Sequence, residues 1–369
     1  MKINSINIKN YRNIGEMNLN FGDTNIIWGE NAQGKTNLLE AIYLFTGEKS
    51  FRGAKDKELI MFGKEFASMN IEFNNNNRNQ SAEIVIKNKR TATLNGIKKK
   101  SAGSLGDEIK AVIFSPVHLN MIKGGPEERR SFVDTALCQL NSNYRMLLKE
   151  YNKTLKQRNT LLKSLDGNLT LTPETEIYLD VWNKNLTKAG AKIVFQRQKY
   201  IEAITPYISE IFCGISDGKE KITAEYFSKA GYIPNMTTEE IENTMMVSLT
   251  GHKTADIVNK TTTVGPHRDD IEIKINGISA KTYASQGQQR SCVLALKLAE
   301  ARLLSKKTGV SPVILLDDVM SELDEKRQDY ILNNIKDRQI FVTCCDKNTI
   351  LRLKSGKTFH ISDGKAEEN

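Results

Sequence analysis

A glycine-rich segment followed by lysine and threonine carries the strongest chemical signal in the sequence. Gly29-Glu30-Asn31-Ala32-Gln33-Gly34-Lys35-Thr36 fits the pattern G-x-x-x-x-G-K-T. The glycines let the backbone wrap so that N–H groups point at phosphate oxygens, and a helix that begins here adds its partial positive charge. Lys35 would reach the β- and γ-phosphates, and the Thr36 hydroxyl would ligate Mg²⁺. The segment therefore predicts a site for ATP and Mg²⁺.

An acidic pair follows an apolar segment near the end of the chain. Val313–Leu316 predicts a buried strand, and Asp317 and Asp318 come directly after it. Asp317 could hold the magnesium shell, and Asp318 could polarise an attacking water. The alternative is a strand that ends in a solvated Asp-Asp turn. The phosphate loop upstream favours the catalytic interpretation.

Two further polar segments flank this acidic pair. Ser285-Gln286-Gly287-Gln288-Gln289-Arg290 precedes a predicted helix, where a hydroxyl, a glycine and a helix N-terminus make an anion site. Alone it is equally typical of a polar helix cap, but about 25 residues before the acidic pair it has the order and spacing of an ABC signature. Ser321-Glu322-Leu323-Asp324 stands in the place of the D-loop. One loop and one signature per chain predict a monomer without nucleotide and a homodimer with ATP and Mg²⁺.

The elements around these segments predict an α/β head. Apolar strands are expected within residues 1–28 and at 313–316 and 340–342, with helices at 36–46, 286–305 and 324–335. Residues 66–100 alternate polar and apolar positions as a β-meander does, and Asn95-Gly96 is a hairpin signal. The predicted fold class is an ABC-type P-loop ATPase head with a mixed sheet, an antiparallel β-meander and an inserted helical lobe.

The inserted lobe is expected at residues 116–264, between two halves of the head at 1–115 and 265–369. Apolar residues between Tyr144 and Leu165 fall on a heptad stripe that Arg158 interrupts, and a second helix is expected from Glu174 to Thr205, before Pro206. These two helices predict a short antiparallel pair. Thr237-x-x-Glu240 predicts a capping box at the start of another helix.

Charge and composition limit the class of partner. The 369 residues carry a net charge of +9, which favours polyanions such as DNA, although a lysine-rich surface can be only solubilising. The five cysteines and four histidines form no metal-ligand spacing. The beginning of the chain does not resemble a signal peptide, and no apolar segment is long enough to span a membrane, so a cytoplasmic protein is expected. The candidates for DNA contact are Lys123, Arg129 and Arg130, together with Lys98–Lys100, Lys149, Lys153, Lys156 and Lys163. Arg129 and Arg130 could equally be structural, in pairs with Glu127 or Asp134.

These segments together resemble the RecF family of bacterial recombination and repair ATPases, from end to end. The strings that carry the resemblance are the phosphate loop, Lys9–Asn13, Ser50–Arg52, Gly124–Asp134, Gly265–Asp270, Ser285–Arg290 and Leu315–Asp324. The resemblance implies ATP-dependent dimerisation, in which the signature of one subunit closes over nucleotide held by the other. It also implies DNA binding at gaps, weak DNA-stimulated ATP hydrolysis, support of recombinase loading and SOS induction, and the partners RecO and RecR.

The resemblance extends to single residues and has departures. It places Arg12 near the nucleotide and leaves Thr343 as the γ-phosphate sensor, because Cys344 and Cys345 stand where small hydroxyl residues are expected. Phe114–Leu119 lacks the acidic pair of the family, so no magnesium role is assigned there. Asp318 replaces the Glu of many ABC-type ATPases, and its shorter reach predicts slow hydrolysis.

Three other interpretations compete with this one. A long-armed chromosome ATPase would need helical arms of hundreds of residues. The nucleotide subunit of a membrane transporter normally has a Leu-Ser-Gly-Gly-Gln type of signature, whereas this chain has Ala-Ser-Gln-Gly-Gln. A DNA clamp that binds ATP and barely hydrolyses it is the third alternative, and the sequence leaves it open.

Overall fold

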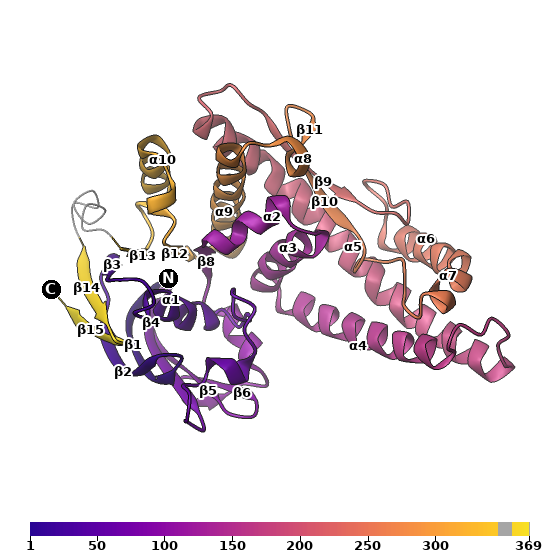
Figure 1. The fold of residues 1–369 in the computed structure, drawn as a ribbon, viewed down its shortest axis with the longest axis horizontal. Coiled ribbons are helices and arrows are strands. Elements are labelled where there is room, and N and C mark those ends of the chain that lie inside the picture. Colours follow the sequence, from indigo (N-terminus) through magenta and orange to yellow (C-terminus); the bar gives the residue numbers. More distant parts are fainter. Residues whose placement is uncertain (346–355, 369) are drawn as a thin grey trace. The chain divides into compact units, whose positions relative to one another are not determined.

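A computed structural model describes residues 1–345 and 356–368 of the chain (Figure 1). The chain divides into two compact units. The head unit comprises Met1–Leu119, Tyr207–Lys221 and Ser285–Asn369, and the second unit comprises Asn120–Pro206 and Ile222–Ala284. This division differs from the expected one at residues 116–119 and 207–221, which belong to the head unit, and at residues 265–284, which belong to the second unit.

The central sheet of the head unit is mostly parallel. Its order is β15-β14-β3-β13-β12-β8, and only β15 runs antiparallel to its neighbour. The strands are β3 (Thr24–Trp28), β8 (Ala111–Phe114), β12 (Val313–Asp317), β13 (Ile340–Cys344), β14 (Lys357–Ser362) and β15 (Lys365–Glu368). Every residue of β8, β12 and β13 is buried; β12 and β13 are interior strands of the parallel part of the sheet, and β8 is its edge strand.

The helices of the head unit lie where the sequence predicts them. Helix α1 (Lys35–Leu44) begins where the loop after β3 ends. Helix α9 (Gln286–Thr308) precedes β12, and α10 (Glu325–Ile335) lies between β12 and β13 in the chain. The predicted helices at 36–46, 286–305 and 324–335 are confirmed to within a few residues at their ends.

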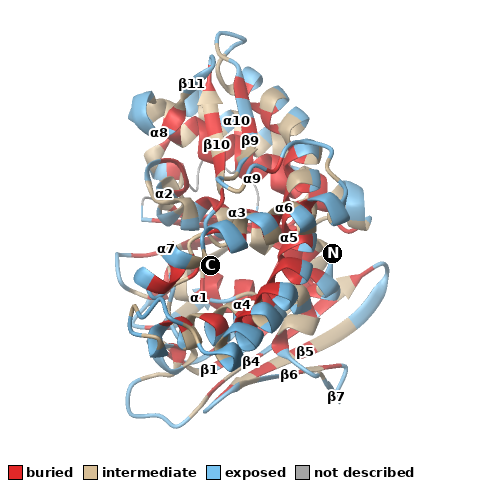
Figure 2. Ribbon diagram, turned by 90° about the vertical axis from the view of Figure 1, so that its right-hand side faces the viewer, coloured by how far each residue is buried: buried red, intermediate tan, exposed pale blue. Residues whose placement is uncertain are grey.

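A second, antiparallel sheet of the head unit confirms the predicted β-meander. Its order is β2-β1-β4-β5-β6-β7, with β1 (Lys2–Tyr11), β2 (Ile14–Asn20), β4 (Ala67–Asn75), β5 (Arg78–Ile86), β6 (Arg90–Leu94) and β7 (Ile97–Lys98). Buried positions alternate with less buried ones along β4 (Figure 2). Asn95 and Gly96 form the two-residue turn between β6 and β7 with φ of 51° and 75°, which is the left-handed conformation that such a turn requires.

The second unit combines helices with a three-stranded antiparallel sheet of order β11-β10-β9. Its helices are α2 (Asn120–Lys123), α3 (Pro126–Leu140), α4 (Ser142–Ser164), α5 (Pro173–Ile215) up to residue 206, α6 (Thr238–Gly251), α7 (Lys253–Val258) and α8 (Ala280–Tyr283). Its strands are β9 (Ile222–Phe227), β10 (Asp270–Ile275) and β11 (Ile278–Ser279). The pairing of β10 with β9 explains why residues 265–284 belong to this unit. The predicted capping box at Thr237 and Glu240 is confirmed.

Helix α5 (Pro173–Ile215) corrects one expectation. It was expected to stop before Pro206, but it continues through the proline for nine more residues. A proline inside a helix costs about 3 kcal/mol. The apolar face continues beyond it, since Ile208, Ile211 and Phe212 are buried. Burying such side chains stabilises by about 1.5–3 kcal/mol each, which outweighs the cost of the proline.

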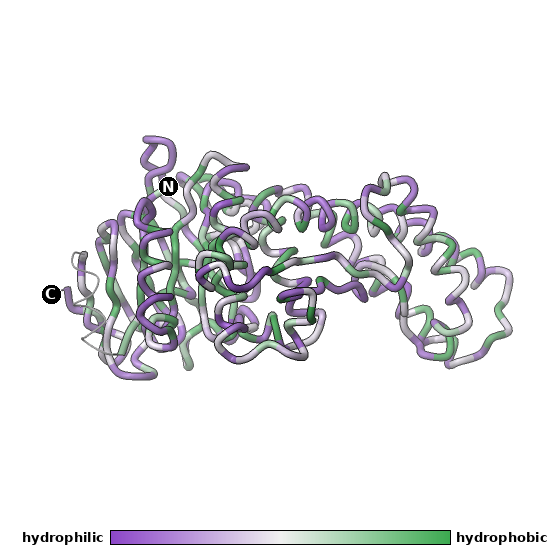
Figure 3. Tube along the Cα trace, turned by 90° about the horizontal axis from the view of Figure 1, so that it is seen from above, coloured by the Kyte–Doolittle hydropathy of each residue, from purple (hydrophilic) through white to green (hydrophobic). Residues whose placement is uncertain are grey.

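No helix among residues 1–345 and 356–368 is long and apolar enough to cross a membrane. Hydrophilic and hydrophobic positions alternate along the trace of the chain in Figure 3. The same residues contain no cluster of three or more His, Cys, Asp or Glu side chains that could hold a metal ion.

Candidate nucleotide-binding site

The two glycines of the phosphate loop are required by its backbone. Gly29 has φ of 150°, and a Cβ atom there would lie 2.3 Å from the carbonyl oxygen of Ile361. Gly34 has φ of 118° at the N-cap of α1, so α1 begins directly at the loop. A side chain at either position would be strained. The strand, loop and helix thus stand in the order that a phosphate site needs.

The side chain of Lys35 lies inside the loop. It is 6% exposed, and its Nζ donates to the carbonyl oxygens of Gly29 (2.5 Å) and Glu30 (2.8 Å) and to Sγ of Cys345 (3.2 Å). These three acceptors use all three protons of the ammonium group. The predicted phosphate-binding lysine is therefore held at the loop by partners that a phosphate oxygen could replace.

Residues distant in the sequence fix the remaining loop positions. The side chain of Asn13 donates to the carbonyl oxygens of Ala32 (3.3 Å) and Gln33 (3.1 Å). The side chain of Gln33 accepts from the backbone N–H of Asp363 (2.7 Å), and that of Asn31 accepts from Cys345 (3.0 Å). Asn13, which lies in the string Lys9–Asn13, and Asp363 were not predicted as site residues, because sequence spacing does not show which residues support a loop from another part of the chain.

The carboxylate of Asp317 gathers three hydroxyl groups at the end of β12. Its Oδ1 accepts from the hydroxyls of Thr36 (2.7 Å) and Thr343 (3.1 Å), and its Oδ2 accepts from that of Ser115 (3.3 Å). Asp317 is only 4% exposed, and burial raises its pKa, against which these hydrogen bonds act. Oxygen ligands suit Mg²⁺, so Thr36 and Asp317 fit the magnesium site that the sequence predicts.

Asp318 adopts a left-handed backbone conformation beside this group. Its φ is 54°, and its backbone N–H donates to the hydroxyl of Thr343 (2.8 Å). Thr343 therefore contacts both members of the acidic pair. The strand end brings together Asp317, Asp318 and Thr343, which the sequence analysis placed at one site.

Ser115 contributes to the site although no role was assigned to Phe114–Leu119. Besides its hydroxyl contact with Asp317, its backbone N–H donates to Nδ1 of His118 (3.1 Å). Burial lowers the pKa of His118, which favours the neutral ring that can accept this hydrogen bond. The segment thus reaches Asp317 through a hydroxyl group rather than through an acidic side chain.

Arg12 lies at the end of β1 and is held by a carboxylate on α1. Its Nε and Nη2 donate to the two oxygens of Glu40 at 2.9 and 3.0 Å. Glu40 is completely buried and also accepts from the hydroxyls of Tyr11 (2.9 Å) and Ser50 (2.5 Å). Arg12 is thereby tied to the helix that begins at the phosphate loop, and its approach to nucleotide stays a prediction.

The segment predicted as a signature caps α9. Ser285 accepts from the backbone N–H of Gln288 (3.2 Å), and the Gln288 side chain accepts from that of Ser285 (2.7 Å) while donating to Glu220 (2.5 Å). Ser285 and Gln286 are exposed, and Gly287 follows within the first turn. This capping box fixes a helix N-terminus with free surface around it.

The segment in the place of the D-loop is also locally ordered. The Ser321 hydroxyl donates to the carbonyl oxygen of Asp318 (2.9 Å). Asp324 caps α10 by accepting from the backbone N–H of Arg327 (3.0 Å), and this N–H lowers its pKa. The Arg327 side chain pairs with Asp324 and donates through Nε to Ser291 of α9 (3.0 Å). The segment thus joins the acidic pair to the helix that Ser285 caps.

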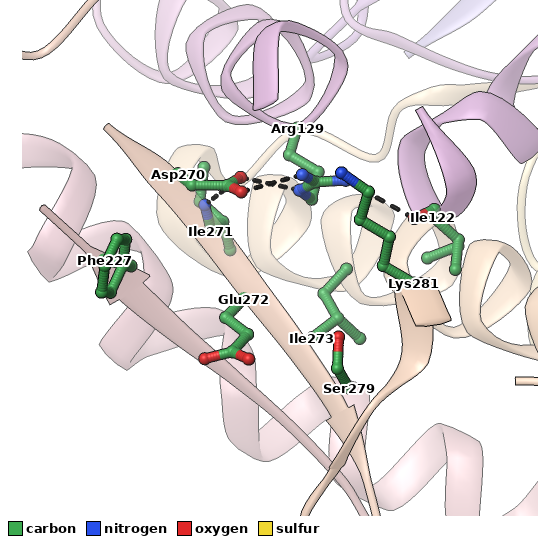
Figure 4. A pocket seen from close by; sticks show the side chains of 9 residues that line it. All are labelled: Ile122, Arg129, Phe227, Asp270, Ile271, Glu272, Ile273, Ser279 and Lys281. Atoms are coloured by element: carbon green, nitrogen blue, oxygen red, sulfur yellow. Dashed lines mark hydrogen bonds and ion pairs between the residues drawn. The ribbon is translucent and has the colours of Figure 1, made fainter. Parts of the chain in front are cut away.

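In the second unit, the three cations predicted to contact DNA have different surroundings. Lys123 is exposed at the end of α2. Arg129 is 5% exposed and pairs through two nitrogens with Asp270 at 2.7 and 2.8 Å, as Figure 4 shows, while Nη1 donates to the carbonyl oxygens of Met121 and Gly124. Arg130 donates to the carbonyl oxygen of Asp269 (2.6 Å). Arg129 therefore stabilises the unit itself, and the predicted DNA contact does not fit its buried guanidinium.

The string Gly265–Asp270 contributes a buried polar cluster to the second unit. A ring nitrogen of His267 lies 2.7 Å from the Tyr151 hydroxyl, and Asp269 accepts from Tyr226 (2.5 Å) and Ser228 (2.6 Å). Burial lowers the pKa of His267 to about 4 and raises that of Asp269 to about 6. Both groups therefore titrate differently in the folded and unfolded chain.

The two shifts have opposite effects on stability between about pH 4 and pH 6. As pH falls, the unfolded chain protonates His267 while the folded chain does not, so this histidine lowers the stability. At Asp269 the folded chain takes up the proton at a higher pH than the unfolded chain does, so this aspartate raises the stability. Each shift corresponds to about 3 kcal/mol. Relative to the wild type, His267→Gln should therefore gain stability on acidification from pH 6.5 to 4.5.

Urea unfolding at a series of pH values, followed by the fluorescence of Trp182 in a Trp28→Phe background, checks this prediction. The contributions of all other groups cancel in the comparison with the wild type. His252→Gln, at an exposed histidine of the same unit, is the matched control and should follow the wild-type slope. A His267→Gln slope equal to that of the wild type would show that the His267 ring is protonated as easily in the folded chain as in water.

The chain resembles known proteins over its whole length. The family described as RecF/RecN/SMC N terminal domain matches residues 2–365. The DNA replication and repair protein RecF of Agathobacter rectalis is 38% identical over 372 residues, covering 100% of this chain and 99% of that protein. The RecF of Ruminiclostridium cellulolyticum is 40% identical over 362 residues, covering 97% and 96% of the two chains.

Solved structures agree with these relatives. The recombination mediator protein RecF-ATPrS in the RecFOR pathway matches with a TM-score of 0.91 and 37% identity, covering 99% of this chain and 97% of that one. An Smc head domain from Pyrococcus furiosus, 18% identical with a TM-score of 0.55, covers 100% of this chain and 96% of that one and shares the fold alone. The predicted fold class and family are confirmed: the chain belongs to the RecF family of the RecF/RecN/SMC proteins.

Proposed function

We propose that this chain is an ATP-dependent DNA-binding protein of recombinational repair and replication, which dimerises with ATP and hydrolyses it slowly. The observation that carries the proposal is the contact between Thr36 of the phosphate loop and Asp317 at the end of β12 (2.7 Å). A loop for phosphate and a carboxylate for magnesium meet there, from segments 281 residues apart. Relatives solved as RecF-ATP and RecF-ATPrS support ATP as the nucleotide.

In this proposal each residue of the nucleotide site has a separate role in binding or hydrolysing ATP. The backbone of Gly29–Thr36 and the Lys35 ammonium bind the phosphates, and Thr36 with Asp317 would hold Mg²⁺, which stabilises the charge that develops on the transferred phosphoryl group. Asp318 polarises the attacking water, and Thr343, which contacts both carboxylate residues, senses the γ-phosphate.

Dimerisation completes the site in this proposal. The exposed N-terminus of α9, with Ser285, Gln286, Gly287 and Gln288, closes over the nucleotide of a second copy, because helix N-termini bind anions. Ser321 and Asp324 lie in the segment between the acidic pair and α10 and take part in the same contact. ATP thereby controls whether two chains come together.

DNA is the partner that the net charge of +9 favours. Lys123 is the exposed candidate for phosphate contact, with Arg130 beside it, and Arg129 is left out because its partners lie within the unit. Membership of the RecF family supports single- and double-stranded DNA at gaps as the substrate and RecO and RecR as partners. It also supports a role in recombinase loading and SOS induction, in the cytoplasm.

DNA affinity measured with ATP, with ADP and across a salt series tests the proposal. Binding to gapped DNA should be tight only with ATP and fall linearly on a log–log salt scale. Lys35→Met, which removes the phosphate-binding charge at similar length, should lose the ATP effect. Lys123→Ala, the matched control, should keep the ATP effect and reduce the salt slope by about one. The absence of DNA binding in every nucleotide state would refute the proposal.

A further inference from the structure

Cys345 is the residue that links the end of β13 to the phosphate loop. It follows the strand that carries Thr343, and its Sγ accepts from Nζ of Lys35 (3.2 Å) and donates to Oδ1 of Asn31 (3.0 Å). The thiol is exposed and forms no disulfide. It thus touches two residues of the loop at once while remaining open to reagents.

The three acceptors of the Lys35 ammonium are not equivalent. The carbonyl oxygens of Gly29 and Glu30 lie at 2.5 and 2.8 Å, whereas Sγ of Cys345 lies at 3.2 Å, and a thiol is a weak acceptor. Because all three protons of the ammonium group are used, a phosphate oxygen can bind only after one acceptor leaves. The sulfur is the acceptor that costs least to replace.

We propose that covalent modification of Sγ of Cys345 excludes nucleotide, because this thiol contacts both Lys35 and Asn31 of the phosphate loop and a phosphate oxygen would have to replace it as a partner of Lys35. The inference rests on the proposed ATP site and adds a thiol-sensitive control to it. A group attached at Sγ stands beside both Lys35 and Asn31, where the phosphates must enter. Replacement by alanine removes the thiol, so Cys345→Ala is the variant that iodoacetamide cannot modify at this position.

Alkylation with iodoacetamide tests this inference. The reagent forms an S–C bond at Sγ and releases iodide and the thiol proton, and mass spectrometry of peptides gives the rate at each cysteine. Saturating MgATP should slow alkylation of Cys345 by about 10-fold or more, whereas adenosine, which lacks phosphates, should not. Cys213, exposed on α5, is the internal control, and its rate should not change.

Nucleotide affinity after alkylation provides the second measurement. Alkylated wild type should lose at least about 10-fold in affinity for a fluorescent ATP analogue. Cys345→Ala should bind the analogue equally well before and after the same treatment. Cys213→Ser should behave as the wild type. The analogue also shows independently whether the site fills. If it fills while ATP leaves the rate at Cys345 unchanged, or if the alkylated protein binds normally, the inference is wrong; if untreated protein never binds ATP, the proposed function itself fails.

Discussion

Replacing Asp318 by asparagine is expected to slow ATP hydrolysis by about 100- to 1000-fold while ATP still binds, because an amide cannot take a proton from the attacking water. The substitution suits the backbone. Asp318 has φ of 54°, a conformation in which asparagine and aspartate are several-fold enriched among non-glycine residues, and its N–H contact with Thr343 does not involve the side chain. Single-turnover phosphate release and equilibrium ATP binding measure the two effects separately.

Asp318→Glu examines why the site carries the shorter carboxylate. The longer side chain gains about one methylene of reach, but the left-handed backbone disfavours it by about 1–2 kcal/mol. If reach alone limits the rate, hydrolysis by Asp318→Glu should exceed that of the wild type. Asp317→Asn is the comparison at the neighbouring position and should raise the Mg²⁺ requirement. Wild-type turnover by Asp318→Asn would show that Asp318 does not polarise the water, and the chain would then act as a clamp whose hydrolysis has another origin.

The parts of the site that the sequence could predict are local in the chain. The phosphate loop needs a strand, two glycines and a helix in succession, and all of them lie within 24–44. Asp317 and Asp318 follow an apolar strand directly. Periodicity likewise predicted the β-meander and the helical pair, since each depends on neighbouring residues.

The remaining parts depend on residues that only the fold brings together. The sequence around Glu40 predicts an exposed polar position on an amphipathic helix. In the structure Glu40 is completely buried and accepts hydrogen bonds from Tyr11, Arg12 and Ser50. Cys345 reads as a departure from the family, and its contact with Lys35 spans 310 positions. Sequence spacing carries no information on such contacts.

At Arg129 and Pro206 the local sequence is typical of a different structure from the one observed. A charge between two further charged residues is typical of a surface, but Arg129 is buried because Asp270, far along the chain, pairs with it. A proline typically ends a helix, but the apolar face of α5 continues through Pro206. In both cases tertiary packing outweighs the local preference.

Breaking the buried ion pair of Arg158 is expected to have a large effect on the stability of the second unit. It interrupts the apolar stripe of α4, and in the second unit it is 1% exposed, paired with the fully buried Asp256 at 2.7 Å. Its Nε donates to Asn183 and its Nη1 to Thr262, each at 2.8 Å. Removing one partner of such a pair leaves an uncompensated buried charge. Arg158→Met is therefore expected to lower the free energy of unfolding of this unit by about 3–5 kcal/mol.

Trp182 reports the second unit, and Trp28→Phe removes the tryptophan of the head unit, so urea unfolding of this unit can be followed by fluorescence in the Trp28→Phe background. Asp256→Asn should cost a similar amount, since it leaves the arginine unpaired. The double variant should lose much less than the sum of the two, because the charges act as a pair. If the losses were additive, Arg158 and Asp256 would stabilise the unit through separate contacts, Arg158 with Asn183 and Thr262 and Asp256 with Thr263, and the ion pair would contribute nothing of its own.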